Sequence, residues 1–344
     1  MKHFLTVLVA LLMPLLASAQ NSVTFDGAEK GLSYPDVEIL IDEPVNMIPG
    51  ARTEVILYAL PNGTLIEWTA GAKVEPGGDF RFDEQHIAAQ TQFLRARDKK
   101  CNYVTIYLKT RQKAWNNWHK QHVDIAKDTY DKLFADVVSL YGEYNPTLTI
   151  GSHSGGGYLI FNYFRVADQV NPAIGHIIFL DSVYGYTTED HLVKFTEWLK
   201  DPGHKLTVIT YEDSNVIFRG KPLVTKTGGC WGRSSQMIED LGQNFRIREK
   251  VKYVKDGGDS DPSIRADERI FNDETNVSTN AYMEVWRGLG GRISLKRLRN
   301  PEGRIWHMVL VEKNGFIDSV LTGTRKEGRG YRFWGPRAYS EYIR

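Results

Sequence analysis

The sequence predicts an α/β protein in which a mostly parallel sheet is covered by helices on both faces. Short apolar runs rich in β-branched residues alternate along the chain with longer segments of helical periodicity. Several runs are apolar throughout, as expected for strands buried on both faces of a sheet. The 344 residues contain no internal repeat and no convincing linker. We therefore expect residues 20–344 to form one domain.

The expected elements follow from local signals. A strand at 53–60 ends in the turn signal Pro61–Thr64, and Pro146 breaks the chain before another strand. The segment 123–141 keeps its apolar residues broadly on one side, which is typical of an amphipathic helix. Expected strands are 53–60, 103–108, 148–150, 174–180, 206–211 and 293–298. Expected helices are 83–97, 123–141, 158–166, 192–199, 234–241 and 307–321.

The periodicity weakens between about 214 and 290, where polar residues and glycine become more frequent. This stretch is expected to be an insertion between the last two strands or a lid over the site. The final segment, 328–344, is basic and rich in aromatic residues, and we expect it to pack against its own domain.

The first 19 residues have the composition of a secretory signal peptide. A short polar start with Lys2 precedes the apolar run 4–16, and Ala17–Ser18–Ala19 is a small-residue cleavage site. Cleavage after Ala19 would give a secreted or periplasmic protein. No other stretch approaches the length of about 20 apolar residues that spans a bilayer.

The charge and cysteine content of the chain argue against several classes of function. The chain has 43 basic and 42 acidic residues, and without Lys2 the two counts are equal. A nearly neutral chain does not indicate binding to nucleic acid or to an anionic membrane. Cys101 and Cys230 could form one disulfide in an oxidising compartment, although Cys101 could equally be a buried thiol at the start of a strand. No Cys/His spacing indicates a metal site.

The stretch 149–157 carries the clearest chemical signal. It leads from a β-branched run through small residues to an apolar-periodic segment, with Ser154 at the apex. Strand, sharp turn and helix around a serine form a nucleophile elbow, in which small neighbours let strand and helix approach closely. The pattern departs from G-x-S-x-G because Ser152 replaces the first glycine.

The order of further residues supports a Ser-acid-His triad. In parallel α/β sheets, functional groups gather beyond the carboxyl ends of the strands. Ser154, Asp181, Asp213 and His307 each follow a different expected strand. A histidine must accept the serine proton, and a carboxylate must orient that histidine and stabilise its charged form. Ser154 and His307 are therefore predicted to be the nucleophile and the general base.

The mature chain resembles the α/β-hydrolase superfamily, and in particular its largely uncharacterised secreted bacterial members. The resemblance rests on the stretches 60–64, 82–87, 152–156 and 180–185, which read LPNGT, FDEQHI, SHSGG and LDSVYG. It implies a mostly parallel central sheet, a catalytic triad and no metal or organic cofactor. The resemblance does not indicate a particular substrate.

Two residues compete for the acid position. Most α/β-hydrolases place the acid after the strand that ends here at Tyr211, which favours Asp213. Some lipases place it one strand earlier, which favours Asp181, and the LDSVYG stretch is the sharper local signal. The structural alternatives are a helix N-cap for Asp181 and an Asx-turn for Asp213.

The same comparison suggests groups around the nucleophile. The oxyanion donors would be the N–H of Gly155 and that of Asn62 or Gly63, in the turn after the third strand. His86 and Gln90 lie one helical turn apart and could line a substrate pocket with His153, although structural roles are as common for such residues.

These observations predict an exported serine hydrolase that cleaves an ester through an acyl-enzyme. A peptidase on the same fold would use the same triad. A non-catalytic binding or scaffold protein could also retain the fold, because fold does not determine function. The sequence leaves the oligomeric state open.

Overall fold

The computed structural model describes most of the chain from residue 22 to residue 321. The described ranges are 22–70, 87–218, 220–225, 227–245, 247–250, 280–285, 292–298, 308–312 and 315–321. The expected signal peptide, His86 and His307 lie outside these ranges.

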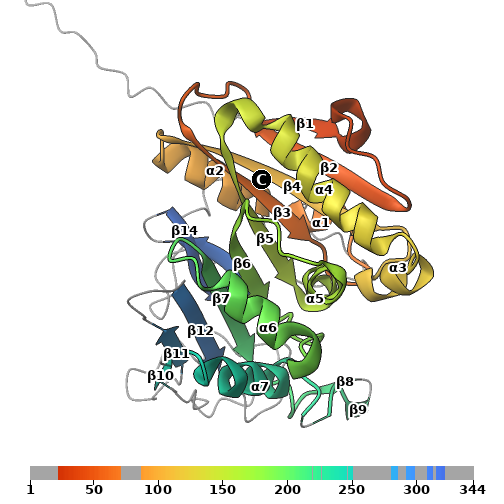
Figure 1. Ribbon diagram of the computed structural model, residues 1–344, viewed down its shortest axis with the longest axis vertical. Coiled ribbons are helices and arrows are strands. Elements are labelled where there is room, and N and C mark those ends of the chain that lie inside the picture. The colour runs from red at the N-terminus through yellow and green to blue at the C-terminus, as the bar shows by residue number, and fades with distance from the viewer. Residues whose placement is uncertain are drawn as a thin grey trace, which may run out of the picture.

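A twisted ten-stranded sheet forms the centre of the molecule (Figure 1). Its order is β1-β2-β4-β3-β5-β6-β7-β12-β11-β10. The six strands from β4 to β12 are parallel, and two antiparallel strands flank them on each side. Their bounds are β1 Ser22–Asp26, β2 Val37–Pro44, β3 Arg52–Ala59, β4 Cys101–Thr110, β5 Pro146–His153, β6 Ile174–Leu180, β7 Lys205–Tyr211, β10 Ile247–Lys250, β11 Asn280–Val285 and β12 Arg292–Leu298.

Helices cover both faces of this sheet. Four helices, α4 to α7, lie on the near face in Figure 1, and α2 lies behind the sheet. The larger buried core joins the four near helices to the sheet, and a smaller cluster joins α2 to β3 and β4. The helices are α1 Ile66–Ala70, α2 Ile87–Arg97, α3 Trp115–Gln121, α4 Ala126–Leu140, α5 Gly157–Val166, α6 Thr188–Trp198 and α7 Cys230–Gly242.

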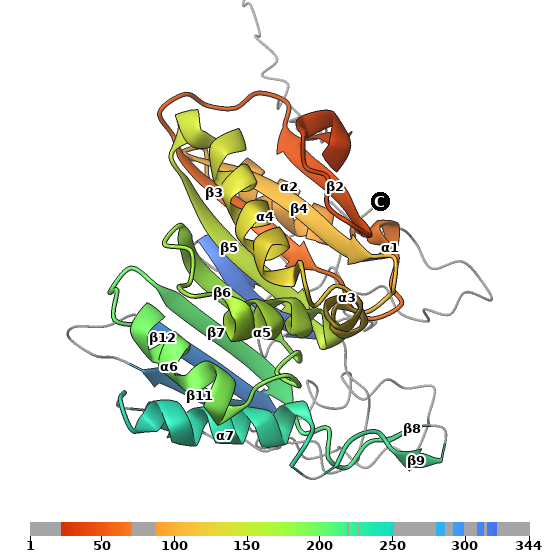
Figure 2. The same ribbon diagram turned by 45° about the vertical axis from the view of Figure 1, so that its right-hand side comes forward.

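Two small hairpins lie outside the central sheet. The β8–β9 hairpin, Ile217–Phe218 and Lys221–Pro222, projects beyond α7 (Figure 2). The strands β13, Met308–Glu312, and β14, Gly315–Leu321, form the second hairpin.

The alternation of strands and helices predicted from the sequence is confirmed from β3 to β7. Each expected strand in this region is present, and β5 with α5 forms the predicted strand–turn–helix unit. The expected helix at 123–141 begins later, at Ala126, and the separate helix α3 precedes it. The expected helix at 83–97 is described only from Ile87.

The expected helix at 307–321 is wrong, because the described part of this segment forms the β13–β14 hairpin. Both halves contain β-branched residues, which suit strands. The first two strands, β1 and β2, were not expected. The apolar alternation at 37–41 was the signal that could have identified β2.

The region expected to be an insertion contributes to the main fold. Helix α7 packs on β7 and α6, and β10 and β11 extend the sheet beyond β12. No helix in the described part of the chain is long and apolar enough to cross a bilayer.

Both cysteines are free thiols, so the possible Cys101–Cys230 disulfide is not formed. Cys101 begins β4 and Cys230 begins α7, and both side chains are buried. Burial raises the pKa of the Cys101 thiol to about 11. Burial, together with the nearby carboxyls of Asp181 and Asp213, raises the pKa of Cys230 well above its usual range.

We expect neither thiol to react in the native protein at pH 8, because both remain protonated and shielded from solvent. Titration with an aromatic disulfide reagent should detect no thiol before denaturation and both thiols afterwards. A rapid native reaction would contradict the buried free thiols, and the absence of thiols after denaturation would indicate a disulfide.

Candidate active site

Ser154 lies at the apex of the turn between β5 and α5. Its backbone has a φ of 49°, in the left-handed region that non-glycine residues seldom adopt. The side chain is half-buried. A strained backbone at a sharp strand-to-helix turn is the geometry that exposes a nucleophile at the edge of a sheet.

Three glycines after Ser154 allow this turn to pack closely. A Cβ atom on Gly155 would overlap the Asn62 side chain, one on Gly156 would overlap the Ala59 carbonyl, and one on Gly157 would overlap the Ser182 carbonyl. Helix α5 therefore begins in direct contact with the residues that follow β3 and β6. None of the three glycines needs a positive φ, so close approach is the reason for their presence.

Ser152 occupies the position of the missing first glycine and has a structural partner. Its hydroxyl oxygen lies 2.8 Å from that of Ser182, and both side chains are buried. The Ser182 hydroxyl also donates to the Ser152 carbonyl at 3.3 Å. This serine pair joins the strand that precedes the elbow to the turn after β6, a link that the sequence did not reveal.

Asp181 lies beside the elbow. His153 and Leu180 are paired across β5 and β6, and Ser154 and Asp181 directly follow them. Asp181 also has a left-handed backbone, with a φ of 44°, and its peptide N–H donates to the Ile209 carbonyl at 2.6 Å. Two neighbouring strands thus end in strained, non-glycine residues.

The Asp181 carboxyl is buried and poorly paired. Oδ1 accepts no hydrogen bond from the described residues, and the contact of Oδ2 with the Tyr184 hydroxyl is long, at 3.5 Å. Burial, reinforced by the charge of Asp213, raises the pKa of Asp181 well above its usual range, and hydrogen bonds from the Tyr211 backbone and from the Cys230 and Tyr184 side chains partly oppose this shift. A buried carboxylate in this position requires an additional donor or a positive charge.

Asp213 is also buried, but both of its carboxylate oxygens have partners. Oδ2 accepts from the Cys230 N–H at 2.6 Å, and Oδ1 accepts from the Trp231 N–H at 3.1 Å. These N–H groups belong to the first turn of α7 and would otherwise have no hydrogen-bond acceptor within the helix. The carboxylate of Asp213 also offsets the positive end of the helix dipole. Burial raises the pKa of Asp213, whereas the two N–H groups lower it.

The turn after β3 lies over Gly155. Thr64 N–H donates to the Pro61 carbonyl at 3.3 Å, which closes a β-turn around Asn62 and Gly63. The Gly63 N–H donates to the Lys113 carbonyl at 2.8 Å, so it is already used. Of the two residues predicted for the oxyanion hole, Asn62 is the one in contact with the elbow.

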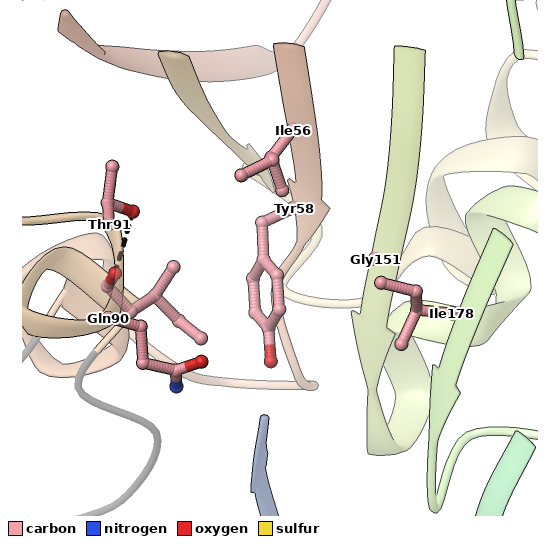
Figure 3. Close-up of a pocket in the computed structure, with 7 residues that line it drawn as sticks. Ile56, Tyr58, Gln90, Thr91, Gly151 and Ile178 are labelled. Atoms are coloured by element: carbon pink, nitrogen blue, oxygen red, sulfur yellow. Dashed lines mark hydrogen bonds between the residues drawn. The ribbon is translucent and has the colours of Figure 1, made fainter. Parts of the chain in front are cut away.

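Two of the three expected pocket residues, Gln90 and His153, lie on the face of the sheet covered by α2, and His86 lies outside the described residues. Gln90 is buried on α2 and lines a cavity (Figure 3), and His153 is the buried last residue of β5. Within the part of the chain that the structure describes, no group of three or more His, Cys, Asp or Glu side chains could hold a metal ion.

The sheet and the serine elbow together identify the architecture. The chain has the α/β-hydrolase fold. No family model matches the chain, and no curated protein matches its sequence.

Several solved structures of the α/β-hydrolase fold are similar to parts of this chain. A poly(3-hydroxybutyrate) depolymerase from Bordetella parapertussis is 11% identical, with 65% of this chain and 77% of that chain covered and a TM-score of 0.37. A feruloyl esterase module from Clostridium thermocellum is 12% identical, with 64% and 73% covered and a TM-score of 0.39.

A thermostable esterase is 15% identical over 65% of this chain, with a TM-score of 0.37. The match spans only 52% of that esterase. Because all these TM-scores are below 0.5, the assignment of the α/β-hydrolase fold rests on the sheet and the elbow described above.

The close packing of the elbow can be tested with two glycine variants. We expect Gly157→Ala to destabilise the protein by about 1–3 kcal/mol or more, because the new methyl group would overlap the Ser182 carbonyl. Gly142→Ala is the matched control, since nothing lies within 4 Å of its added methyl group. Denaturant unfolding would measure both, and equal stabilities would contradict the close approach of α5 to the β6 turn.

Proposed function

We propose that this protein is an exported serine hydrolase that cleaves esters through an acyl-enzyme. The left-handed backbone of Ser154 at the β5–α5 elbow is the observation that carries this proposal. Such strain is costly, by about 1–3 kcal/mol per residue, and tends to persist where function requires it. Export is proposed from the signal-peptide composition of residues 1–19.

Asp181 is the better candidate for the triad acid. Asp213 uses both carboxylate oxygens to hold the first turn of α7. Asp181 keeps one buried oxygen without a hydrogen bond from the described residues, and it directly follows the strand beside the elbow. A histidine N–H would provide the missing donor and would favour the ionised form of Asp181. We propose His307 for that role from its position in the sequence.

The proposed reaction follows from these placements. His307 removes the proton from the Ser154 hydroxyl as its oxygen attacks the ester carbonyl, and Asp181 stabilises the resulting imidazolium. The backbone N–H groups of Gly155 and Asn62 stabilise the negative oxygen. His307 then protonates the departing alcohol. Water activated by the same histidine releases the acid and regenerates Ser154.

Fluorophosphonate labelling tests the nucleophile directly. We expect the purified mature protein to be labelled on Ser154, because only an activated serine attacks this phosphorus centre. Ser154→Ala should abolish labelling, and His307→Ala should slow it sharply. Ser139→Ala is the control, since Ser139 lies on α4, away from the elbow. A folded wild-type protein that resists the probe would favour a binding protein that retained the fold.

The two acids can be distinguished by matched amide variants. We expect Asp181→Asn to lower kcat for an ester by about 10³–10⁴-fold, because a neutral amide would not stabilise the imidazolium. Asp213→Asn should chiefly destabilise the protein, by about 1–3 kcal/mol, because the amide nitrogen cannot accept from one of the two N–H groups that Asp213 holds and leaves that buried donor unsatisfied.

Steady-state kinetics and denaturant unfolding on both variants would separate these effects. The reverse pattern, with catalysis lost only in Asp213→Asn, would assign the triad acid to Asp213.

A further inference from the structure

The β8–β9 hairpin projects from the packed layers of helices and sheet (Figure 2). It follows Asp213, at the edge of the sheet where the parallel strands β5, β6 and β7 end. A Cβ atom added to Gly220, in the turn between its two strands, would meet no atom of the described residues within 4 Å. The turn of the hairpin therefore does not pack against the described part of the domain.

The base of the hairpin is fixed to the domain. Val216, which directly precedes β8, is fully buried, and its N–H donates to the Asp213 carbonyl at 3.1 Å. Across the hairpin, the Leu223 N–H donates to the Val216 carbonyl at 2.8 Å. Gly220 has a φ of 76°, which suits a tight connection between antiparallel strands. The hairpin is thus a defined projection with an anchored base.

The projecting segment, residues 217–223, exposes apolar side chains to solvent. Ile217 on β8 is 61% exposed, and Leu223, directly after β9, is 39% exposed. Pro222 is also exposed and pairs with Ile217 across the hairpin, so the two side chains share one face. Single exposed apolar residues are common on protein surfaces. Three of them on one short projection form an apolar surface that would be stabilised by leaving water.

The charges in and around this segment are all positive. Between residues 214 and 232, the sequence contains Arg219, Lys221 and Lys226 and no aspartate or glutamate. The whole chain has a net charge of only +1, so its overall balance does not reveal this local excess. Lys221 is exposed on β9, next to Pro222. The segment therefore combines apolar side chains with an attraction for anions.

This combination fits a lipid bilayer better than a protein partner. A stable protein–protein interface typically uses about 20–30 residues on each side, far more than the segment 217–223 offers. A bilayer requires no such area, because its interface accepts apolar side chains individually. Anionic headgroups also attract each nearby lysine or arginine.

We propose that the β8–β9 hairpin binds the surface of an anionic lipid bilayer. Ile217, Pro222 and Leu223 would enter the boundary between headgroups and acyl chains, and the ammonium group of Lys221 would remain among the headgroup phosphates. The bound hairpin would hold the edge of the sheet at which β5, β6 and β7 end close to the lipid. This inference goes beyond the proposed ester hydrolysis and does not depend on it.

Cosedimentation of the mature protein with vesicles tests the proposal. We expect binding to vesicles of phosphatidylglycerol and phosphatidylcholine in equal parts, and binding at least about tenfold weaker to phosphatidylcholine alone. Ile217→Ser should weaken binding to the anionic vesicles about tenfold, because a hydroxyl gains little from leaving water. Lys221→Gln should weaken it about fivefold, because one attraction to the headgroups is lost.

Val193→Ser and Lys100→Gln are the matched controls, and both should bind as the wild-type protein does. Val193 is an apolar residue on α6 that is 68% exposed. Lys100 is exposed and directly precedes β4, at the opposite edge of the sheet from the hairpin. Thermal unfolding of every variant would establish that each is folded.

Three outcomes would overturn the proposal. No binding of the wild-type protein to the anionic vesicles would do so, and would favour an acidic protein as the partner of the hairpin. Equal binding to the two kinds of vesicle would exclude recognition of anionic lipid. Hairpin variants that bind as well as their controls would place the contact with lipid elsewhere on the molecule.

Discussion

The site depends on the close contact between the start of α5 and the ends of β3 and β6, the two strands that lie on either side of β5. This contact requires three successive residues without side chains, Gly155 to Gly157, because backbone or side-chain atoms occupy the space next to each Cα. Helix α5 can then begin immediately after β5, and this sharp turn restricts the backbone of Ser154 to the left-handed region. The strain at Ser154 is held by the packing of β3, β5 and β6, and it would relax if that packing loosened.

The same contact explains why two buried acids beyond adjacent strands have different environments. Asp213 faces the N-terminus of α7, where unpaired N–H groups and the helix dipole favour a carboxylate. Asp181 is held by the strained turn that packs against α5, and one of its two carboxylate oxygens receives no hydrogen bond from the described residues. Removing a carboxylate from water without full compensation costs free energy. This difference supports the proposal that Asp213 stabilises the start of α7 and that Asp181 is the triad acid.

Much of the fold could be predicted because its signals are local. The apolar runs that became β3 to β7 and the small-residue turn around Ser154 are visible in the sequence. The hairpin β13–β14 was predicted as a helix because an apolar run shorter than about eight residues fits either period. The pairing of β10 and β11 with β12 depends on contacts distant in sequence, which no local pattern specifies.

The candidate site, like the fold, could be predicted from the sequence only in part. Ser154 and the two acids could be proposed from motif and chain order, but the choice between Asp181 and Asp213 depends on which N–H groups reach each carboxylate. The partnership of Ser152 with Ser182 joins residues 30 positions apart and could not be inferred from spacing. Of the residues that line the cavity beneath α2, only Gln90 was predicted as a pocket residue, because Tyr58, Gly151 and Ile178 become neighbours only through strand register.

Strand β5 shows how one short segment can carry several functions. Side chains alternate between the two faces of a strand, so Gly151 and Ser152 point to opposite sides. Ser152 lies on the face covered by α4 to α7, where it joins the elbow to the Asp181 turn, and Gly151 lies on the α2 face, where the Tyr58 ring packs close to it. Ser154 then lies beyond both, at the end of the strand. A shift of register by one residue would exchange the two faces, removing the Tyr58 ring from Gly151 and breaking the serine pair together. The position of the nucleophile and the shape of the space beside it are therefore set by the same strand pairing.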